Sequence, residues 1–468
     1  MAEVATDKIA PPRLLPLTLA LSVFFWIVAT TGGRQVFVKE VLSEAYDSQA
    51  EHLLRGDPGV DVAAIRHEAI IVNGKVFMYF GPFPALLRIP LNLIYPGGRG
   101  TWSRISGFCA AVIALFAFAG LISQALRCSA LSARWRNWLG NACLAGFALA
   151  SPLLFLLGNL SIYNEAVTWG FAWSLAALFF AYRSRNAEGR RITCSLLGFS
   201  VCAAAALLSR VTFGLPLLLI APLLALGLPR TKRVTRLIAL VLPLGAGLAF
   251  YLLLSYAKFG TLTGTRYESY INPVHREFAE KNGIFNLRRV ASGLADYFSL
   301  RLPALQNRAP FLRADRHLIP PSSLYSLPFS ETYLPVPLCS SWLVLGGILG
   351  IARLLQPKSS TAFERAVALA FFAQLICILS FHALAERYTA DLYPFLILGL
   401  LVFLRLSGAT ALHTRYAVIG LVGLSIVVNS LTTASWLADV DQNVQPETRA
   451  VWRAILGRNS PAVEEEHP

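Results

Sequence analysis

Charged residues are scarce in this chain of 468 residues: Asp, Glu, Lys and Arg together make up 14% of it, and only 26 residues are acidic. Hydrophobic residues reach 55%, and the mean hydropathy is +0.56. A soluble domain carries about 25% charged residues, because its surface must be solvated. The scarcity of charge therefore excludes an ordinary soluble domain and indicates an integral membrane protein.

Sequence patterns for several classes of site are also missing. The seven cysteines are an odd number without metal-ligand spacing, and most lie inside apolar runs, which argues against a disulfide framework. No Gly-rich phosphate loop, Walker pattern, nucleophile elbow or zinc-protease helix occurs. These absences disfavour an enzyme that uses ATP or a nucleotide sugar. We expect no metal site, and the need for a divalent cation as cofactor is left open.

Basic residues are distributed unevenly between the apolar runs. Every second gap is short and basic, and these gaps hold 18 of the 41 Lys and Arg residues but only 4 of the 26 acids. Lys and Arg in short loops stay on the cytoplasmic side during membrane insertion. The pattern predicts that these gaps face the cytoplasm and that the polar working surface lies outside. The net charge of +15 then favours membrane lipids and lipid phosphates as partners, and not nucleic acid.

The apolar runs predict an all-α polytopic membrane protein. A helix needs about 20 mostly apolar residues to cross a bilayer core roughly 30 Å thick. The first run lacks a small-x-small cleavage site, so we expect a retained anchor with its N-terminus inside, and an odd number of spans then places the C-terminus outside. We expect one transmembrane domain over 1–436 and an outward tail over 437–468. The predicted spans, about eleven, are 14–32, 105–126, 139–157, 166–182, 193–209, 213–228, 237–256, 337–353, 366–382, 391–404 and 417–436.

Two of the predicted outward loops are long, about 33–104 and about 257–336. The first opens with an amphipathic helix that ends at Gly56, followed by an Asn73-Gly74 pair between β-formers, which predicts a small hairpin. The stretch GPFPALLRIPLNLIYPG then carries four prolines and is too short to span, so we expect it at the membrane–water boundary. The second loop predicts a short helix around 277–300 and otherwise irregular structure.

Three segments together resemble the GT-C superfamily of polyprenyl-phosphate-sugar-dependent glycosyltransferases, especially its bacterial aminoarabinose and mannosyl transferases. Members open the first outer loop with an acidic helix that ends in Leu-x-x-Gly, continue with a proline-containing interfacial helix and a second span, and carry Arg-Tyr before a Pro-Phe or Pro-Leu at a late span. The corresponding segments here are SEAYDSQAEHLLRG, FPALLRIPLNLIY with ISGFCAAVIALFAFAGLISQALR, and ERYTADLYPFLIL.

The resemblance implies a GT-C-like membrane enzyme of the bacterial inner membrane with a periplasmic or extracellular active face. It would transfer a sugar, usually with inversion, from a polyprenyl-phosphate donor to a glycan, lipid or protein acceptor. One departure matters, because many members begin the acidic helix with Asp-Glu whereas this chain has Ser43-Glu44. The missing carboxylate raises the alternative of a catalytically silent scaffold.

Glu44 and Asp47 are the candidate catalytic residues. The implied reaction needs a carboxylate that removes a proton from the acceptor hydroxyl. The two acids are three residues apart, so they share one face of a helix. The alternative interpretation has no catalytic role: the two residues are solvated acids that the helix dipole favours in the first turn of a helix. Which of them replaces the missing first acid is left open.

Arg387 and Tyr388 are the candidate ligands of the donor phosphate, because a planar guanidinium matches phosphate oxygens in a bidentate way. The plain interpretation is an Arg and a Tyr that anchor a helix end at the membrane surface. Arg88, in the interfacial helix, is a further donor candidate, although snorkelling to head groups is the favoured interpretation.

Glu165 and Arg210 lie near the outer ends of the fourth and fifth predicted spans. An acid that enters a membrane segment usually has a partner or a task, so the two form either a buried structural pair or part of the cavity lining. In the second loop, Arg266, Tyr267 and Glu268 are candidates for substrate binding through aromatic faces and charged groups.

A transporter or lipid flippase is the alternative function. Such a protein is expected to show paired halves and ionisable residues deep within its spans. Here the ionisable residues gather at the outer ends and in the outer loops, which favours the transferase.

Overall fold

The computed structural model describes residues 10–262, 264–313, 331–409 and 411–458. Within these ranges the chain is mainly helical. Long helices form one bundle, with bounds α1 (Leu15–Ala29), α5 (Ser103–Arg127), α6 (Ala133–Leu149), α7 (Pro152–Gly158), α8 (Ile162–Arg185), α9 (Arg190–Ser209), α10 (Val211–Leu226), α11 (Arg233–Phe259), α15 (Ser341–Leu354), α16 (Ala362–Leu379), α17 (Tyr393–Leu406) and α18 (Leu412–Ser435).

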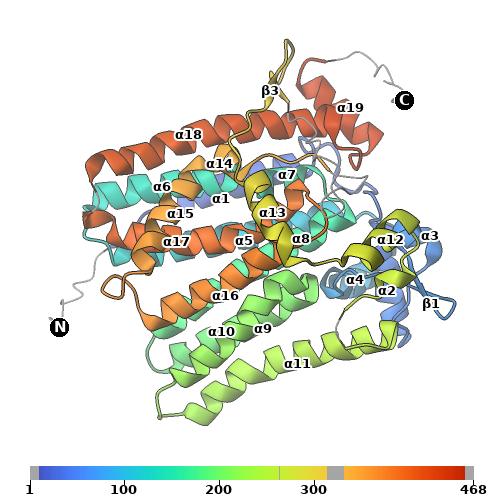
Figure 1. Ribbon diagram of the computed structural model, residues 1–468, viewed down its shortest axis with the longest axis horizontal. Helices are drawn as coiled ribbons and strands as arrows, with labels where there is room; N and C mark the ends of the chain where they lie inside the picture. Colours follow the sequence, from blue (N-terminus) through green and yellow to red (C-terminus); the bar gives the residue numbers. More distant parts are fainter. Residues whose placement is uncertain (1–9, 263, 314–330, 410, 459–468) are drawn as a thin grey trace.

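The shorter elements gather mostly at one end of the bundle, on the right in Figure 1. We call this end the loop-layer end. The elements at this end are α2 (Glu44–Leu54), α3 (Val62–Ile65), β1 (Ile70–Val72), β2 (Lys75–Phe77), α4 (Phe83–Ile94), α12 (Pro273–Asn282) and α19 (Pro446–Ile455). The elements α13 (Val290–Tyr297), β3 (Ala304–Leu305), β4 (Leu312–Arg313) and α14 (Val336–Cys339) are drawn nearer the middle of the bundle's length. Three 3₁₀ segments matter below: η3 (Tyr267–Ser269) precedes α12, η4 (Leu287–Arg289) joins α12 to α13, and η5 (Glu386–Asp391) joins α16 to α17.

Nine of the eleven predicted spans each overlap with one helix of the bundle, whereas 139–157 covers parts of α6 and α7 and 337–353 covers parts of α14 and α15. By length and composition, six helices of the described ranges are long and apolar enough to cross a membrane. They are Ser103–Arg127, Ala133–Gly158, Arg190–Ser209, Arg233–Phe259, Ala362–Leu379 and Leu412–Val440. The all-α membrane architecture is therefore supported, while the number of spans and their orientation stay predictions.

The third predicted span, 139–157, is broken into α6 and α7 at Ala150–Ser151. Pro152 starts α7 at a position where its missing N–H costs nothing, and the Ser151 hydroxyl accepts a hydrogen bond from the Leu153 N–H. The carbonyls freed by the break need partners in an apolar interior. Asn429 of α18 donates to the carbonyls of Leu149 and Ser151, at 2.9 and 3.2 Å. Because the freed carbonyls have partners, the break is stable inside the bundle.

Helices α15 and α17 cross with their backbones almost in contact. A Cβ added at Gly350 would lie 1.7 Å from the carbonyl oxygen of Gly399, and one added at Gly399 would lie 2.2 Å from that of Gly347. Small residues at membrane helix crossings permit this close approach. The crossing fixes α17, and therefore the η5 segment that precedes it.

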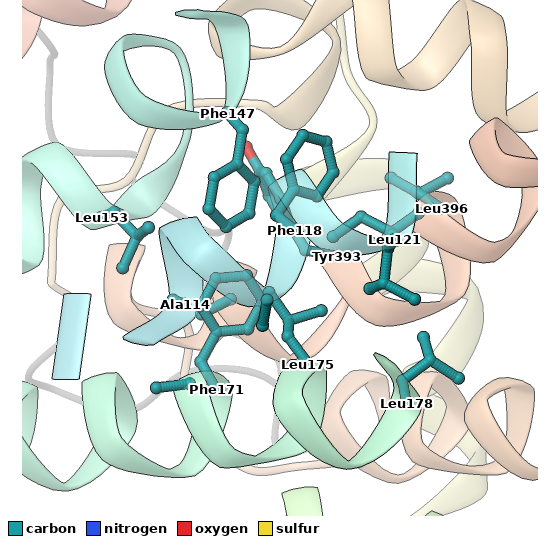
Figure 2. Packing of buried hydrophobic residues seen from close by; sticks show 14 of the residues in the cluster. Ala114, Phe118, Leu121, Phe147, Leu153, Phe171, Leu175, Leu178, Tyr393 and Leu396 are labelled. Atoms are coloured by element: carbon teal, nitrogen blue, oxygen red, sulfur yellow. The ribbon is translucent and has the colours of Figure 1, made fainter. Parts of the chain in front are cut away.

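Aromatic and aliphatic side chains pack together in the core of the bundle, as Figure 2 shows. Phe118 stacks on Phe147 with ring centroids 4.1 Å apart, and Phe147 contacts Phe171 at 5.9 Å. Phe171 meets Tyr393 edge to face at 6.3 Å. Tyr393 is the first residue of α17, so the same core also positions η5.

The predicted elements of the first loop are present. The amphipathic helix is α2, the proline-containing helix is α4, and the Asn73-Gly74 turn joins β1 to β2 with both turn residues at positive φ, 51° and 75°. The helix expected around 277–300 is instead divided into α12 and α13, and the hairpin of β3 and β4 was not predicted. The predicted C-terminal tail contains α19, where the Thr448 hydroxyl accepts a hydrogen bond from Arg104 at 2.8 Å.

Candidate functional site

The candidate site lies at the loop-layer end, where several helices begin or end. Arg210 separates α9 from α10 and has an extended backbone (φ −158°, ψ 120°), so the helical path is interrupted at this residue. The segment η5 leads into α17, where Pro394 occupies an early position that tolerates proline. Because helix ends present polar groups without breaking the apolar bundle, this end can hold a charged ligand.

Two arginine side chains share one aromatic ring. The guanidinium carbon of Arg210 lies 5.1 Å from the ring centroid of Tyr388, and that of Arg387 lies 4.8 Å from it. Arg387 also lies 4.8 Å from the ring centroid of Tyr163, in the first turn of α8. Cation–π contacts orient a guanidinium and leave N–H groups at its edge for another partner. The predicted pair Arg387 and Tyr388 is thus joined by Arg210.

Each of these arginines also has a carboxylate partner. Arg210 Nη2 lies 3.5 Å from Asp391 Oδ2, and Asp391 accepts hydrogen bonds from Thr212 at 2.5 Å and from Gln374 at 3.2 Å. Arg387 pairs with Glu331, whose side chain is 34% exposed. A partly exposed carboxylate is cheap to displace, since water can solvate it after it leaves. An anionic ligand can therefore compete with Glu331 for Arg387.

The first outer loop reaches the arginines through Glu68, a residue that is not among the candidates of the sequence analysis. Glu68 is buried and accepts hydrogen bonds from the hydroxyls of Tyr163 and Tyr270, both at 2.5 Å. The Tyr163 ring lies against Arg387, so a tyrosine separates the carboxylate from the guanidinium. No local pattern marks Glu68 and Tyr163, because they meet only when the first loop folds onto α8.

A second charged cluster is completely buried beside the first. Arg88 Nη2 donates to both carboxylate oxygens of Glu165, at 2.6 and 2.8 Å, and both side chains are 0% exposed. The Ser103 hydroxyl donates to Glu165 Oε2 at 2.8 Å, and Arg88 Nε lies 3.8 Å from Asp47 Oδ2. One cation and two carboxylates therefore share this interior.

Two expectations are corrected by this cluster. Glu165 does not pair with Arg210, because α4 places Arg88 against the start of α8 while Arg210 contacts Asp391 of η5. Arg88 does not snorkel to the membrane surface, since its guanidinium is enclosed and bound to Glu165. The Arg88 guanidinium is thus bound to the Glu165 carboxylate, and in this structure it is not accessible to a sugar donor.

Glu44 and Asp47 have different surroundings although both lie on α2. Asp47 is buried, and its carboxylate accepts hydrogen bonds from Asn92 at 2.7 Å and from the Gly100 N–H at 3.1 Å. Burial raises the pKa of Asp47, and Arg88 with these hydrogen bonds opposes the rise. Glu44 pairs with Lys39, and its side chain is 40% exposed. Of the two, Glu44 is the carboxylate with open space beside it.

That open space is a cavity of about 440 Å³. Segments 38–44 and 64–67 of the first loop form most of its wall, and Gln445 and Glu447 complete it from the C-terminal segment. His67, on the wall, has its Nε2 3.3 Å from the Tyr163 hydroxyl. The cavity beside Glu44 is therefore connected through His67 and Tyr163 to Arg387.

The second-loop candidates are only partly brought to this region. Tyr267 lies 6.3 Å from Tyr79 and 5.7 Å from Tyr270 between ring centroids, inside an aromatic cluster next to Glu68. Arg266 and Glu268 are exposed, with their charged atoms 4.0 Å apart. The structure thus associates Tyr267 with the site and leaves Arg266 and Glu268 at the surface. Among the described residues, no group of three His, Cys, Asp or Glu side chains has a geometry that would hold a metal ion.

Glu386 leads to a pH-dependent prediction. It is 1% exposed, its Oε2 accepts a hydrogen bond from the Leu334 N–H at 2.8 Å, and burial raises its pKa to about 8. The folded state therefore binds this proton more tightly than the unfolded chain. The contribution of the protonated carboxyl to the free energy of unfolding is fully present below about pH 4.5. It is lost as the pH rises through the window up to about pH 8, and the total loss is roughly 5 kcal/mol.

We expect the thermal unfolding midpoint of the wild type in detergent to decrease as the pH is raised from 5 to 8. In Glu386→Gln the midpoint should vary much less over the same range. Glu280→Gln, which changes an exposed glutamate of α12, should retain the wild-type slope. Equal slopes in all three proteins would contradict the assignment of this dependence to Glu386.

Comparisons with known proteins yield structural neighbours only. No family model matches the chain, and no curated protein matches it. Two crystal structures of ArnT from Cupriavidus metallidurans are similar in fold. The one bound to undecaprenyl phosphate has a TM-score of 0.45 and 14% identity, over 95% of this chain and 68% of that chain. The one in the apo state has a TM-score of 0.34 and 12% identity, over 94% of this chain and 84% of that chain.

Proposed function

We propose that this protein transfers a sugar from a polyprenyl-phosphate-linked donor to an acceptor of the cell envelope, at the outer face of the bacterial inner membrane. The observation that carries this proposal is the placement of Arg210 and Arg387 on the Tyr388 ring, at the end of a membrane helix bundle. Two guanidinium groups at this position can bind the oxygens of a lipid-borne phosphate. Glu331 would leave Arg387 when the phosphate binds.

The proposed chemistry is a displacement at the anomeric carbon of the donor sugar. The acceptor hydroxyl oxygen forms the new glycosidic bond, the bond from the anomeric carbon to the phosphate oxygen breaks with its electron pair, and polyprenyl phosphate leaves. The acceptor proton passes to a carboxylate. Negative charge on the leaving phosphate is stabilised by the two guanidinium groups, which are held in place before the reaction.

We assign the proton-accepting role to Glu44. Its side chain borders the 440 Å³ cavity and is partly exposed, whereas the Asp47 carboxylate is buried and held by Asn92 and Gly100. A base must reach the hydroxyl from which it takes the proton. Asp47 is then a structural residue that orients α2 against α4.

Glu44→Gln is expected to lower transfer by about 100-fold or more, since a positioned base contributes about that factor. The assay follows radiolabelled sugar from a polyprenyl-phosphate donor into the envelope fraction, with purified protein in proteoliposomes. Binding of undecaprenyl phosphate should be unchanged. Asp47→Asn should mainly lower the unfolding midpoint, and Glu280→Gln serves as the control. Full transfer by Glu44→Gln would rule out Glu44 as the base.

The same measurements separate the alternative functions. Binding of undecaprenyl phosphate without transfer to any acceptor fraction would indicate a silent scaffold, in agreement with Ser43 at the position of the missing acid. Counterflow of labelled lipid-linked sugar across the proteoliposome without group transfer would indicate a flippase. Either result would overturn the transferase proposal.

A further inference from the structure

The β3–β4 hairpin and the residues just before it expose large apolar side chains that the proposed reaction does not use. The exposed fraction is 76% for Leu300, 75% for Leu302, 85% for Leu305 and 56% for Phe311. A single exposed leucine is ordinary on a protein surface, but four large apolar side chains within 300–311 form a group. Such a group marks a surface that binds a partner of apolar character.

The segment 300–313 combines these apolar side chains with basic ones. Its sequence is LRLPALQNRAPFLR, which holds three arginines and no acidic residue. Arg301, Arg308 and Arg313 are all exposed. Apolar side chains mixed with Arg are typical of segments in the membrane–water boundary, because the apolar groups reach the acyl chains while the guanidinium groups stay among the lipid head groups. The charge of the hairpin therefore complements an anionic lipid surface.

The hairpin lies beside a helix that is apolar enough to cross the membrane. Strand β4 packs against α18, which forms most of the candidate span Leu412–Val440. On α18 the apolar side chains of Leu424 and Val427 are each 55% exposed, so this helix has a face open to lipid. Figure 1 shows α18 along the upper edge of the bundle and the hairpin projecting beyond that edge, across the direction of the long helices. A hairpin that projects sideways from a span stays close to the bilayer.

Hydrogen bonds hold the hairpin at the end of this span. Arg458 Nη1 donates to the carbonyl of Ala309, in the hairpin loop, at 3.3 Å. The same guanidinium donates to both carboxylate oxygens of Asp439, at 2.6 and 2.9 Å. Asp439 belongs to η7 (Trp436–Val440), which ends the candidate span. The hairpin loop is thus fixed at the depth where the hydrocarbon core gives way to head groups.

Pairing within the hairpin lowers the cost of leaving water. The strands pair Ala304 with Arg313 and Leu305 with Leu312. Beyond the strands, the Gln306 N–H donates to the carbonyl of Phe311 at 3.0 Å, and the Phe311 N–H donates to the carbonyl of Arg308 at 2.8 Å. Backbone polar groups need such partners wherever water is scarce. The hairpin can therefore enter the boundary without leaving these groups unpaired.

We infer that the β3–β4 hairpin inserts into the membrane–water boundary beside the end of α18. Its leucines and Phe311 lie among the upper acyl chains, and its arginines lie among anionic head groups. The partner is the lipid bilayer around the protein. This surface is separate from the arginines of the candidate site, so the inference does not depend on the proposed function.

The test locates residue 305 of the full-length protein in vesicles of phosphatidylethanolamine and phosphatidylglycerol. The seven native cysteines are replaced by alanine, and Leu305→Cys is labelled with the fluorophore NBD. The label is quenched either by phospholipids with a nitroxide on the acyl chain or by iodide in the water. Glu280→Cys, at an exposed position of α12, is the control. We expect the lipid nitroxides to quench the label at 305 about 3-fold more than the label at 280, and iodide to show the reverse order. Equal quenching at the two positions by both agents would overturn the inference.

Variants in the Leu305→Cys background separate the apolar contribution from the basic one. Leu302→Asp with Phe311→Asp should lower quenching by the lipid nitroxides to the value of the control position. Unchanged quenching in this variant would show that the apolar side chains do not hold the hairpin in the membrane, and would overturn the inference.

The basic contribution depends on the lipid. Arg308→Gln with Arg313→Gln should lower quenching by the lipid nitroxides when phosphatidylglycerol is present, and should have no effect in vesicles of phosphatidylcholine. Arg288→Gln, which changes an exposed arginine of η4, is the control for charge and should leave quenching unchanged. Equal effects of the two variants in both lipids would refute the contact with anionic head groups.

A measurement on the wild type covers the case in which the cysteine-free chain does not fold. The protein is irradiated in vesicles that contain a phospholipid with a diazirine in its acyl chain, and the crosslinked peptides are identified by mass. We expect crosslinks in 300–313 and in α18, and none in α12. Crosslinks in α18 without any in 300–313 would overturn the inference. Crosslinks from 300–313 to a second copy of the chain in place of lipid would assign this surface to a protein interface and would equally overturn it.

Discussion

Arg387→Met is expected to lower binding of undecaprenyl phosphate by about 10-fold and sugar transfer by about 100-fold or more, while the protein stays folded. The larger effect on transfer follows from the charge that develops on the leaving phosphate, since loss of a single preorganised donor typically costs 10²–10³ in rate. Stability should change little, because Glu331, the partner left behind, is 34% exposed and can be solvated.

The matched variants distinguish charge from geometry. Arg387→Lys keeps the charge but loses the planar fork and the stacking between Tyr163 and Tyr388, so partial activity is expected. The double variant with Arg210→Met should abolish binding. Arg288→Met, which changes an exposed arginine of η4, should behave like the wild type. Wild-type transfer by Arg387→Met would show that the arginines do not hold the leaving phosphate.

Arg88→Met is expected to produce the largest loss of stability, about 3–5 kcal/mol, because it leaves the Glu165 carboxylate buried without a cation. Replacing both members, Arg88→Met with Glu165→Met, should recover much of this loss, since an apolar pair avoids the uncompensated charge. The measurement is the unfolding midpoint in detergent for the two variants and the wild type.

An exposed ion pair supplies the control for this prediction. Arg99 pairs with Glu51 at the surface, with side-chain exposures of 52% and 27%. Arg99→Met should cost less than about 1 kcal/mol. If Arg88→Met and Arg99→Met shifted the midpoint equally, Arg88 and Glu165 would not form the buried structural pair that we describe.

Local patterns account well for the elements of this fold. The positions of the helices follow from runs of apolar residues, which bury their own backbone polar groups in a helix wherever water is excluded. The Asn73-Gly74 turn was recognisable because few residues accept positive φ at both positions. The Arg387–Tyr388 pair became a candidate through the family resemblance, which places an Arg-Tyr before a Pro-Phe at a late span, and its role stays a prediction.

Pairing between distant segments could not be read in the same way. The sequence places Arg88, Arg210 and Arg387 near the same predicted outer surface, so each of them could pair with Glu165. Only the packing of α4 against α8 selects Arg88. Glu68 and Tyr163, 95 residues apart, meet for the same reason. The break between α6 and α7 depends on Asn429, 278 residues from Ser151. In each case the partner is chosen by contacts over long sequence separations.

The amino-acid order alone determined that this protein is a helical membrane protein, because hydropathy acts locally on each segment during insertion. Loop charge in addition predicted on which side its polar groups lie. Tertiary structure alone decided which charges neutralise each other within the protein and which stay available for a ligand. The physical reason is that a buried charge takes the partner that packing brings within hydrogen-bond distance, and sequence spacing does not encode that distance.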